Sequence, residues 1–290
     1  MQYAELPPSP RLAPFVECFW WLHGHEPPGP ERALDVAFDK VVPDGAPEIV
    51  LNRADPFRRL TDEGEVETHP RMVVVGQLDR FIQLATPAHC DVMGVRLRPA
   101  GLGALFGPVA LELTHRVVDP ADVAPEFARA CAEILDAWGT PFERARSLER
   151  VLLHTIARRA DGASHASRSN DSLVRRAAQH LVETSGRARI STLASDLGIS
   201  ARHLSRLFRP RVGLGPKQLA RILRFQSVMA AAEAHPGASW VHTAIDAGYS
   251  DQAHLIHDAR ALAGDTPRCL IADAGDLTRF FTRSGAASVG

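Results

Sequence analysis

The sequence predicts an α+β protein of more than one domain, with a β-rich N-terminal part and an all-helical C-terminal part. Segments rich in β-branched and aromatic residues fill the first 120 residues, and apolar residues recur at helical spacing after them. A chain of 290 residues also exceeds what one core usually serves. We expect a β-rich domain at 1–120, a helical hairpin at 121–160, a linker at 161–171, a helical domain at 172–272 and a frayed tail at 273–290.

Short strands separated by proline, glycine and aspartate are predicted in the N-terminal part, which is typical of a compact antiparallel sheet or small β-barrel. The predicted strands are Val36–Val42, Glu48–Asn52, Met72–Leu78, Phe81–Thr86 and Asp91–Leu97. The stretch VVPDGAPEIVLN predicts a strand, a turn at Pro43-Asp44-Gly45 and a second strand. A small barrel that is open at one end can hold a ligand.

Two histidines near the N-terminus raise the question of a metal site. His23 and His25, with Glu26 or Glu31 after them, have side chains that suit divalent metals. The sequence offers no third ligand on a nearby strand, so exposed loop histidines are the favoured interpretation. Four aromatic residues lie close together in this region, namely Phe15, Phe19, Trp20 and Trp21. They form either part of the hydrophobic core, which is the interpretation we favour, or the wall of an effector pocket.

The middle of the chain predicts two helices. Their apolar residues at helical spacing are Phe127, Cys131, Ile134, Leu135 and Trp138, then Leu148, Val151, Leu152 and Ile156. Gly139-Thr140-Pro141 separates the two runs, and proline suits the start of a helix. This hairpin either packs on the barrel or serves dimerisation or signal transmission. The polar segment Asp161–Asp171 predicts a linker that lets the following domain move independently.

The stretch ISTLASDLGISARHLSRLF at 190–208 predicts two short helices around a tight turn. The two apolar stripes are Leu193, Ala194 and Leu197, then Leu204, Leu207 and Phe208. Gly198 suits the positive φ of a helix C-terminus, and Ser200 suits the N-cap of the next helix. This pattern predicts a helix-turn-helix, although an ordinary helical hairpin has a similar sequence.

Local charge favours the helix-turn-helix. Eleven basic residues lie between Arg175 and Arg224, opposed by Glu183 and Asp196, which gives +9 in a chain of net charge −1. Ten of the eleven are arginine, whose planar group suits phosphates and the guanine edge. Arg202, Ser205, Arg206 and Arg209 lie opposite the second apolar stripe, on a face that the major groove of DNA accepts. The alternative, a merely solvated surface, normally includes acidic residues as well.

A similar arrangement follows about fifty residues later. Trp240–Ile245 is apolar-rich, Gly248-Tyr249-Ser250 forms the turn with Ser250 as N-cap, and Asp251–Ala263 is the next helix. A helix at Pro216–Ala234, stopped by His235-Pro236-Gly237, lies between the two units. About twenty residues span roughly 30 Å, close to the ~34 Å of one DNA turn. The two units therefore suit successive major grooves.

The stretch 172–272 resembles the DNA-binding domain of AraC-type transcriptional regulators. The matching motifs are LASDLGISARHLSRLF, VGLGPKQLARILRFQ and DAGYSDQAHLIHDARALAG followed by TP. The resemblance implies base contacts from Arg202, Ser205, Arg206, Gln252, His254 and His257, and we add Arg209 as a DNA contact. The N-terminal part more weakly resembles the cupin-like sensing domain of such regulators. Leu255 and Ala259 replace the phenylalanines usual in this family. Residues 225–290 carry four basic and seven acidic residues, so we expect the helix-turn-helix at 190–208 to supply most of the attraction to phosphates.

The remaining expectations concern partners and chemistry. We expect a cytoplasmic regulator that binds double-stranded DNA and RNA polymerase, responds to a small effector and forms a homodimer, with no leader and no membrane span. We expect no cofactor, no metal and no catalytic residue, and four reduced cysteines. Two alternatives stay open. One is a metal-dependent cupin-type enzyme fused to a DNA-binding module, and the other is a protein-interaction module that has lost DNA binding.

Overall fold

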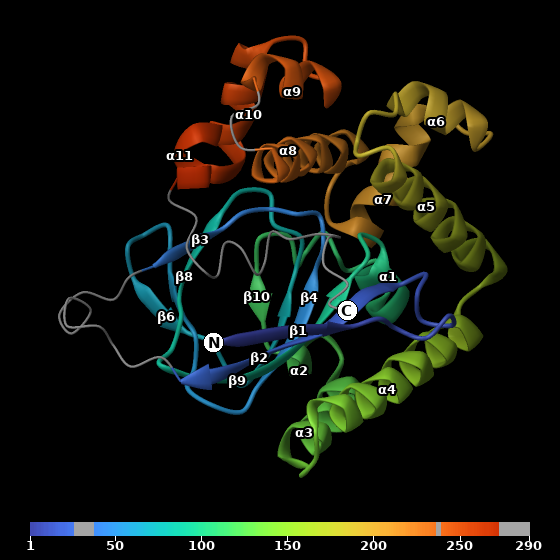
Figure 1. Cartoon of the computed structure of the whole chain (residues 1–290). Helices are drawn as coiled ribbons and strands as arrows, with labels where there is room; N and C mark the ends of the chain where they lie inside the picture. Colours follow the sequence, from blue (N-terminus) through green and yellow to red (C-terminus); the bar gives the residue numbers. More distant parts are fainter. Residues whose placement is uncertain (26–37, 236–238, 273–290) are drawn as a thin grey trace.

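The N-terminal part folds into two antiparallel sheets and the C-terminal part is helical (Figure 1), which confirms the predicted α+β fold class. The computed structural model describes residues 1–25, 38–235 and 239–272. The larger sheet has the order β1 (Gln2–Leu6), β2 (Val16–His25), β9 (His89–Leu97), β4 (Glu48–Asn52), β7 (Met72–Val75), β10 (Val117–Val118). The smaller sheet has the order β3 (Asp39–Val41), β8 (Ile82–Ala85), β5 (Arg58–Leu60), β6 (Val66–Thr68).

The larger sheet is buried on both faces, because alternate residues of its strands join different cores. On β2, Trp20 packs in the core shared with the smaller sheet, whereas Phe19 packs in the core shared with α3 and α4. On β9, Val92 and Val95 divide between the same two cores. Phe19 and Trp20 are each 1% exposed, so both aromatic rings belong to the protein core.

The structure locates most predicted strands and changes how some of them pair. Segment 48–52 is a strand as predicted, and the other four predicted strands are trimmed or extended by a few residues, with Val36 and Ala37 lying outside the described residues. The strands before and after the Pro43-Asp44-Gly45 turn, β3 and β4, belong to different sheets, since β3 pairs with β8 and β4 with β7 and β9. Across the described residues the strands pair as two separate sheets, so they do not form one closed cylinder.

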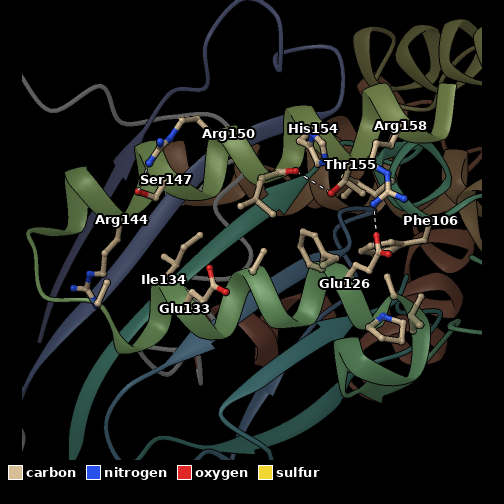
Figure 2. Close-up of a pocket in the computed structure, with 18 of the residues that line it drawn as sticks. Phe106, Glu126, Glu133, Ile134, Arg144, Ser147, Arg150, His154, Thr155 and Arg158 are labelled. Carbon is tan, nitrogen blue, oxygen red and sulfur yellow. Dashed lines mark hydrogen bonds and ion pairs between the residues drawn. The ribbon is translucent and has the colours of Figure 1, made fainter. Parts of the chain in front are cut away.

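A helical hairpin of α3 (Pro125–Asp136) and α4 (Pro141–Gly162) covers one face of the larger sheet. Two short helices, α1 (Gly101–Phe106) and α2 (Pro120–Val123), precede it. Thr140 and Glu143 form a capping box at the start of α4, where Pro141 was predicted to begin a helix. A groove of about 950 Å³ lies between α3 and α4. Figure 2 shows Glu126 of one helix paired with Arg158 of the other. Trp138, in the connection between the two helices, is 97% exposed.

The segment at 161–171, which the sequence predicts to be a linker, is mostly helical. Helix α5 begins at His165 and runs to Glu183, and Ser164 Oγ caps it by accepting a hydrogen bond from the backbone N–H of Ser167. Asp171 is held by two ion pairs, with Arg159 of α4 and with Arg211. These two ion pairs attach a segment of polar composition to the helices on either side of it, α4 and the helix that contains Arg211.

The remaining helices form the C-terminal part. They are α6 (Ile190–Asp196), α7 (Ala201–Val212), α8 (Pro216–Ala234), α9 (Trp240–Asp246), α10 (Gln252–Ala263) and α11 (Pro267–Ala272). Figure 1 shows α8 running between the α6–α7 pair at one end and the α9–α10 pair at the other. Helix α8 has the predicted bounds, with Pro216 in its first turn and His235 as its C-cap.

The helical part is docked on the N-terminal part through the C-terminal end of α7. The backbone N–H of Ala110 donates to the carbonyl of Pro210 at 2.9 Å, and Thr114 Oγ1 donates to the carbonyl of Gly213 at 2.8 Å. A Cβ atom on Gly103 of α1 would lie 2.5 Å from the carbonyl oxygen of Arg211, so this approach requires glycine.

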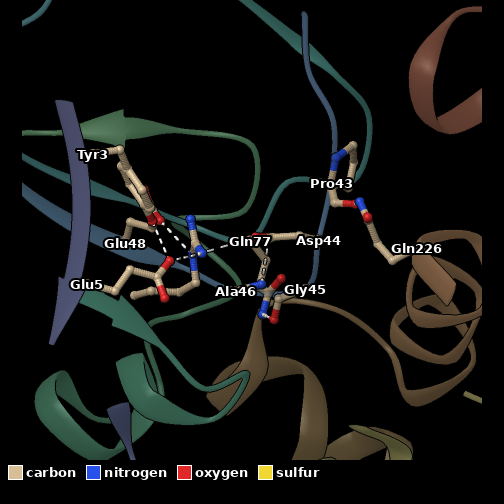
Figure 3. A network of polar contacts seen from close by, with 10 residues as sticks. Tyr3, Glu5, Pro43, Asp44, Gly45, Ala46, Glu48, Gln77 and Gln226 are labelled. Atoms are coloured by element: carbon tan, nitrogen blue, oxygen red, sulfur yellow. Dashed lines mark hydrogen bonds and ion pairs between the residues drawn. The ribbon is translucent and has the colours of Figure 1, made fainter. Parts of the chain in front are cut away.

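A second contact joins α8 to the turn after β3, beside a buried ionic network. Gln226 Nε2 donates to the carbonyl of Pro43 at 2.6 Å, as Figure 3 shows. Behind this turn Arg96 is 1% exposed and lies 3.1 Å from Glu48 Oε1 and 4.0 Å from Asp44 Oδ2. Burial raises the pKa of Asp44 to about 7, although the nearby guanidinium of Arg96 opposes that shift.

Candidate nucleic-acid interface

Helices α6 and α7, which we call the first unit, form the predicted pair of helices around a glycine turn. Gly198 follows α6 with a φ of 72°, a conformation that favours glycine. Ser200 caps α7, since its Oγ accepts a hydrogen bond from the backbone N–H of His203 at 3.1 Å. Leu204 and Phe208 are fully buried and attach α7 to the body of the protein.

The opposite side of α7 carries exposed arginines. Arg202, Arg206 and Arg209 are all exposed, and we call these three residues the arginine face. Ser205 is half-buried, and its hydroxyl donates to the carbonyl of Ala201 at 3.0 Å. The arginine face therefore presents guanidinium groups to solvent, whereas the Ser205 hydroxyl already has a partner on its own helix.

The eleven basic residues of the charged stretch divide into two groups in the structure. Five contact groups within the protein, namely Arg175, Arg187, Arg211, Arg221 and Arg224. Of these five, Arg187 is itself exposed. The other six are exposed and have no such contact among the described residues, namely Arg176, Arg189, Arg202, Arg206, Arg209 and Lys217. About half of the basic residues counted from the sequence thus contact other parts of the protein, and the six without such contacts are available to an anionic partner.

Helices α9 and α10, which we call the second unit, repeat the arrangement with one change. The predicted N-cap Ser250 is wrong, because Asp251 Oδ1 accepts the hydrogen bond from the backbone N–H of His254 at 2.8 Å. This bond lowers the pKa of Asp251. Gln252 and His257 are exposed, whereas the His254 ring packs edge-on against Tyr249, with 5.0 Å between ring centroids.

An ion pair fixes α10 against α8. Asp258 is 3% exposed, and its Oδ1 accepts a hydrogen bond from Arg221 Nε at 2.7 Å. The guanidinium of Arg224 lies 5.5 Å from the centroid of the Tyr249 ring. Burial raises the pKa of the Tyr249 hydroxyl, and the charge of Asp258 raises it further. The second unit therefore has polar attachments to α8 in addition to its apolar core.

The two residues that depart from the usual phenylalanines both lie in that apolar core. Leu255 is 1% exposed and Ala259 is fully buried, in one cluster with Phe225 and Leu262. The smaller side chains are therefore packed against the rest of the unit and not left open to solvent.

The N-terminal residues of the metal hypothesis lie at the end of β2. His23 and His25 are exposed, and Glu26 and Glu31 fall outside the described residues. His89, which the sequence did not single out, faces His25 across the sheet, with 6.4 Å between ring centroids. Among the described residues, no group of three or more histidine, cysteine or acidic side chains is arranged to hold a metal ion. Within the same residues, no helix is both long and apolar enough to cross a membrane.

Comparison with known proteins identifies two regions of the chain. Residues 193–272 match a helix-turn-helix domain, and residues 4–119 match a domain of unknown function (DUF6597). No curated protein matches the sequence. Similar solved structures include ToxT from Vibrio cholerae O395 (9% identity, TM-score 0.44, 83% of this chain and 95% of that one). They also include the AraC-like transcriptional activator CuxR (15% identity, TM-score 0.22, 80% of this chain and 96% of that one).

Proposed function

Because residues 193–272 match a helix-turn-helix domain, we propose that the chain is a DNA-binding transcription regulator of the AraC type that reads a specific DNA sequence with two helices. In this proposal α7 and α10 enter successive major grooves of one duplex. Arg202, Ser205 and Arg206 contact bases from α7, and Arg209 contacts the phosphate backbone. From α10, the proposed base contacts are Gln252, His254 and His257.

The observation that carries the proposal is the arginine face on α7. Three guanidinium groups are exposed on one side of a helix whose other side is anchored by fully buried Leu204 and Phe208. A helix held in this way can enter the major groove without unfolding, and arginine suits both phosphate oxygens and the guanine edge.

The spacing of the two units supports a site that spans one helical turn. Helix α8 has 19 residues, which at 1.5 Å per residue is about 28 Å, near the ~34 Å pitch of B-DNA. The attachments of α10 to α8 through Asp258 and Arg221 limit how far the second unit can move. Since the exposed cations cluster around the first unit, we assign most of the phosphate attraction to that unit.

Selection of bound sequences from random DNA tests the proposal. The full chain is expected to enrich a bipartite site whose halves are separated by about 10 base pairs. Arg206→Ala should relax specificity at one base pair in the half bound by α7, at a cost of about 1–3 kcal/mol for the preferred base. Arg129→Ala, on the exposed side of α3, is the matched control and should leave the site unchanged. Enrichment of no sequence would contradict the proposal.

The proposal further includes a small effector at the N-terminal domain, contact with RNA polymerase, a cytoplasmic location and a homodimer. The α3–α4 hairpin is where we expect the dimer, since Trp138 and Phe142 expose large apolar side chains there. Light scattering on the full chain tests this part. Trp138→Ser should shift a dimer towards monomer, whereas Leu111→Ser, another exposed apolar residue, should not.

A further inference from the structure

A cavity of about 190 Å³ lies where the N-terminal part meets the first unit, and we call it the interdomain cavity. Residues of α1, α4, α5 and α7 line it. Figure 1 shows α5 and α7 side by side at one end of α8. The cavity therefore touches the helix that carries the arginine face and the helices that connect this helix to the N-terminal domain.

The lining is strongly cationic. Four arginines contribute to it, namely Arg159 of α4, Arg168 and Arg175 of α5 and Arg211 of α7. Among the lining residues that the structure describes, Asp171 is the single acidic one. Four cations and one anion leave a net charge of +3 around a small space.

Asp171 is already shared between two of these arginines. Its Oδ2 accepts a hydrogen bond from Arg159 Nη1 at 2.7 Å, and its Oδ1 accepts one from Arg211 Nε at 2.6 Å. The Arg211 side chain is 11% exposed and that of Arg159 is 18% exposed, so both guanidinium groups are largely withdrawn from water. One carboxylate thus serves two largely desolvated cations, which favours a further anion beside them.

The other two arginines have only neutral partners in the contacts resolved for the described residues. Arg168 Nη1 donates to the carbonyls of Ala160 and Ala163 at 3.1 and 2.7 Å. The guanidinium of Arg175 lies 5.4 Å from the centroid of the Phe15 ring. These contacts hold the side chains at the cavity without neutralising their charge.

The size and the remaining lining indicate what kind of anion fits. Phe15, Ile156 and Val174 supply an apolar wall. A cavity of about 150 Å³ can hold benzene, so 190 Å³ accommodates about seven or eight non-hydrogen atoms. This is the size of one carboxylate or phosphate group attached to a short apolar chain.

We propose that the interdomain cavity binds a small organic anion, whose head group lies among Arg159, Arg175 and Arg211 and whose apolar part lies against Phe15 and Ile156. The bound anion joins α4 and α5 to α7 and so changes the position of the arginine face. This regulatory part rests on the proposed DNA-binding function, whereas the binding itself does not. By linkage, the anion and DNA change each other's affinity by the same factor.

Calorimetric titration of the full chain without DNA tests the binding. The probes are hexanoate, propyl phosphate and inorganic phosphate, with hexylamine as the cationic control. Hexanoate or propyl phosphate should bind, inorganic phosphate should bind more weakly because it lacks the apolar chain, and hexylamine should not bind. The better of the first two identifies the head group. Equal binding of hexylamine and the anions, or binding of no anion, would overturn the proposal.

Substitutions locate the site. Arg159→Gln and Arg175→Gln should each weaken the best probe by about tenfold, the loss expected for one charge-assisted hydrogen bond. Arg150→Gln, an exposed arginine of the same helix α4 that lies outside the cavity lining, should not weaken it. Arg175→Gln keeps both ion pairs of Asp171, so it remains informative if Arg159→Gln unfolds the chain. Unchanged affinity in both variants would place the probe elsewhere and refute the assignment.

The two proposals fail in different measurements. Duplex affinity without a probe tests DNA binding, and probe affinity without a duplex tests the cavity. The best probe should change the duplex affinity of the wild-type chain and leave that of Arg175→Gln unchanged. If Arg175→Gln without any probe weakens duplex binding as much as Arg206→Gln does, then the cavity arginine serves DNA and the proposed anion site is wrong.

Discussion

The salt dependence of DNA binding offers the sharpest test of the exposed charge. We consider the change of Arg202, Arg206 and Arg209 together to glutamine, which removes the arginine face while leaving buried Leu204 and Phe208 in place. Each phosphate that a cation neutralises releases counterions, so the logarithm of the affinity falls by about 0.9 per unit of log salt for each contact. Non-specific binding to an arbitrary duplex depends on this effect alone.

The magnitude follows from the number of exposed cations. Six exposed basic residues of the charged stretch have no internal contact among the described residues, so the wild-type slope should approach about −5 if all six contact phosphates. Between 50 and 200 mM salt the affinity should then fall by about 10³. With three cations removed, the slope should fall to about −3 and the loss to about fortyfold. Counting all eleven basic residues would instead predict a slope near −10.

Fluorescence anisotropy with a labelled duplex of about three helical turns measures these slopes. Arg129→Gln, an exposed arginine of α3, serves as the control and should leave the slope at its wild-type value. A slope that the triple substitution does not change would refute the assignment of the arginine face to DNA. A wild-type slope near −10 would refute the argument that internally paired arginines are withheld from phosphates.

Three further predictions concern stability, each measured by urea unfolding of the full chain. Phe208→Ala should cost about 3–5 kcal/mol because the ring is fully buried, and a cost below 1 kcal/mol would contradict that packing. Asp258→Ala should cost about 1.5–3 kcal/mol through loss of its charged hydrogen bond to Arg221, and a neutral result would show that the pair does not hold α10. Because burial raises the native pKa of Asp44 to about 7 from an ordinary 3.8, the native state retains a proton that the unfolded chain releases. The stability that this group confers is therefore fully present below pH 4 and declines as the pH rises to 7. The free energy of unfolding of Asp44→Asn should therefore increase relative to that of the wild type across this range. A difference that does not change with pH would refute the shift.

Local signals in the sequence predicted the helical part well. Helix α8 has its predicted bounds because a proline suits its first turn and the apolar periodicity ends near His235. The turn at Gly198 and the cap at Ser200 follow from the same kind of short-range chemistry. The N-cap of α10 was displaced by one residue, since Ser250 and Asp251 are adjacent capping residues and only the path of the turn selects between them.

Pairing between distant residues was beyond the sequence. The segment at 161–171 has a linker's composition, yet it is mostly helical, and Arg159 and Arg211 bind Asp171 from two other helices. The strands on either side of Pro43-Asp44-Gly45 are neighbours in the chain, yet they join different sheets.

The candidate site shows the same division. The sequence by itself determined which helices form, where they turn and that a dense positive charge surrounds the first unit, because propensity, capping and periodicity act within a few residues. Only the tertiary structure decided which arginines remain exposed and which bind Asp171, Asp258 or Tyr249, and where the interdomain cavity lies. Those outcomes depend on packing between elements separated by tens of residues, which a local pattern cannot encode.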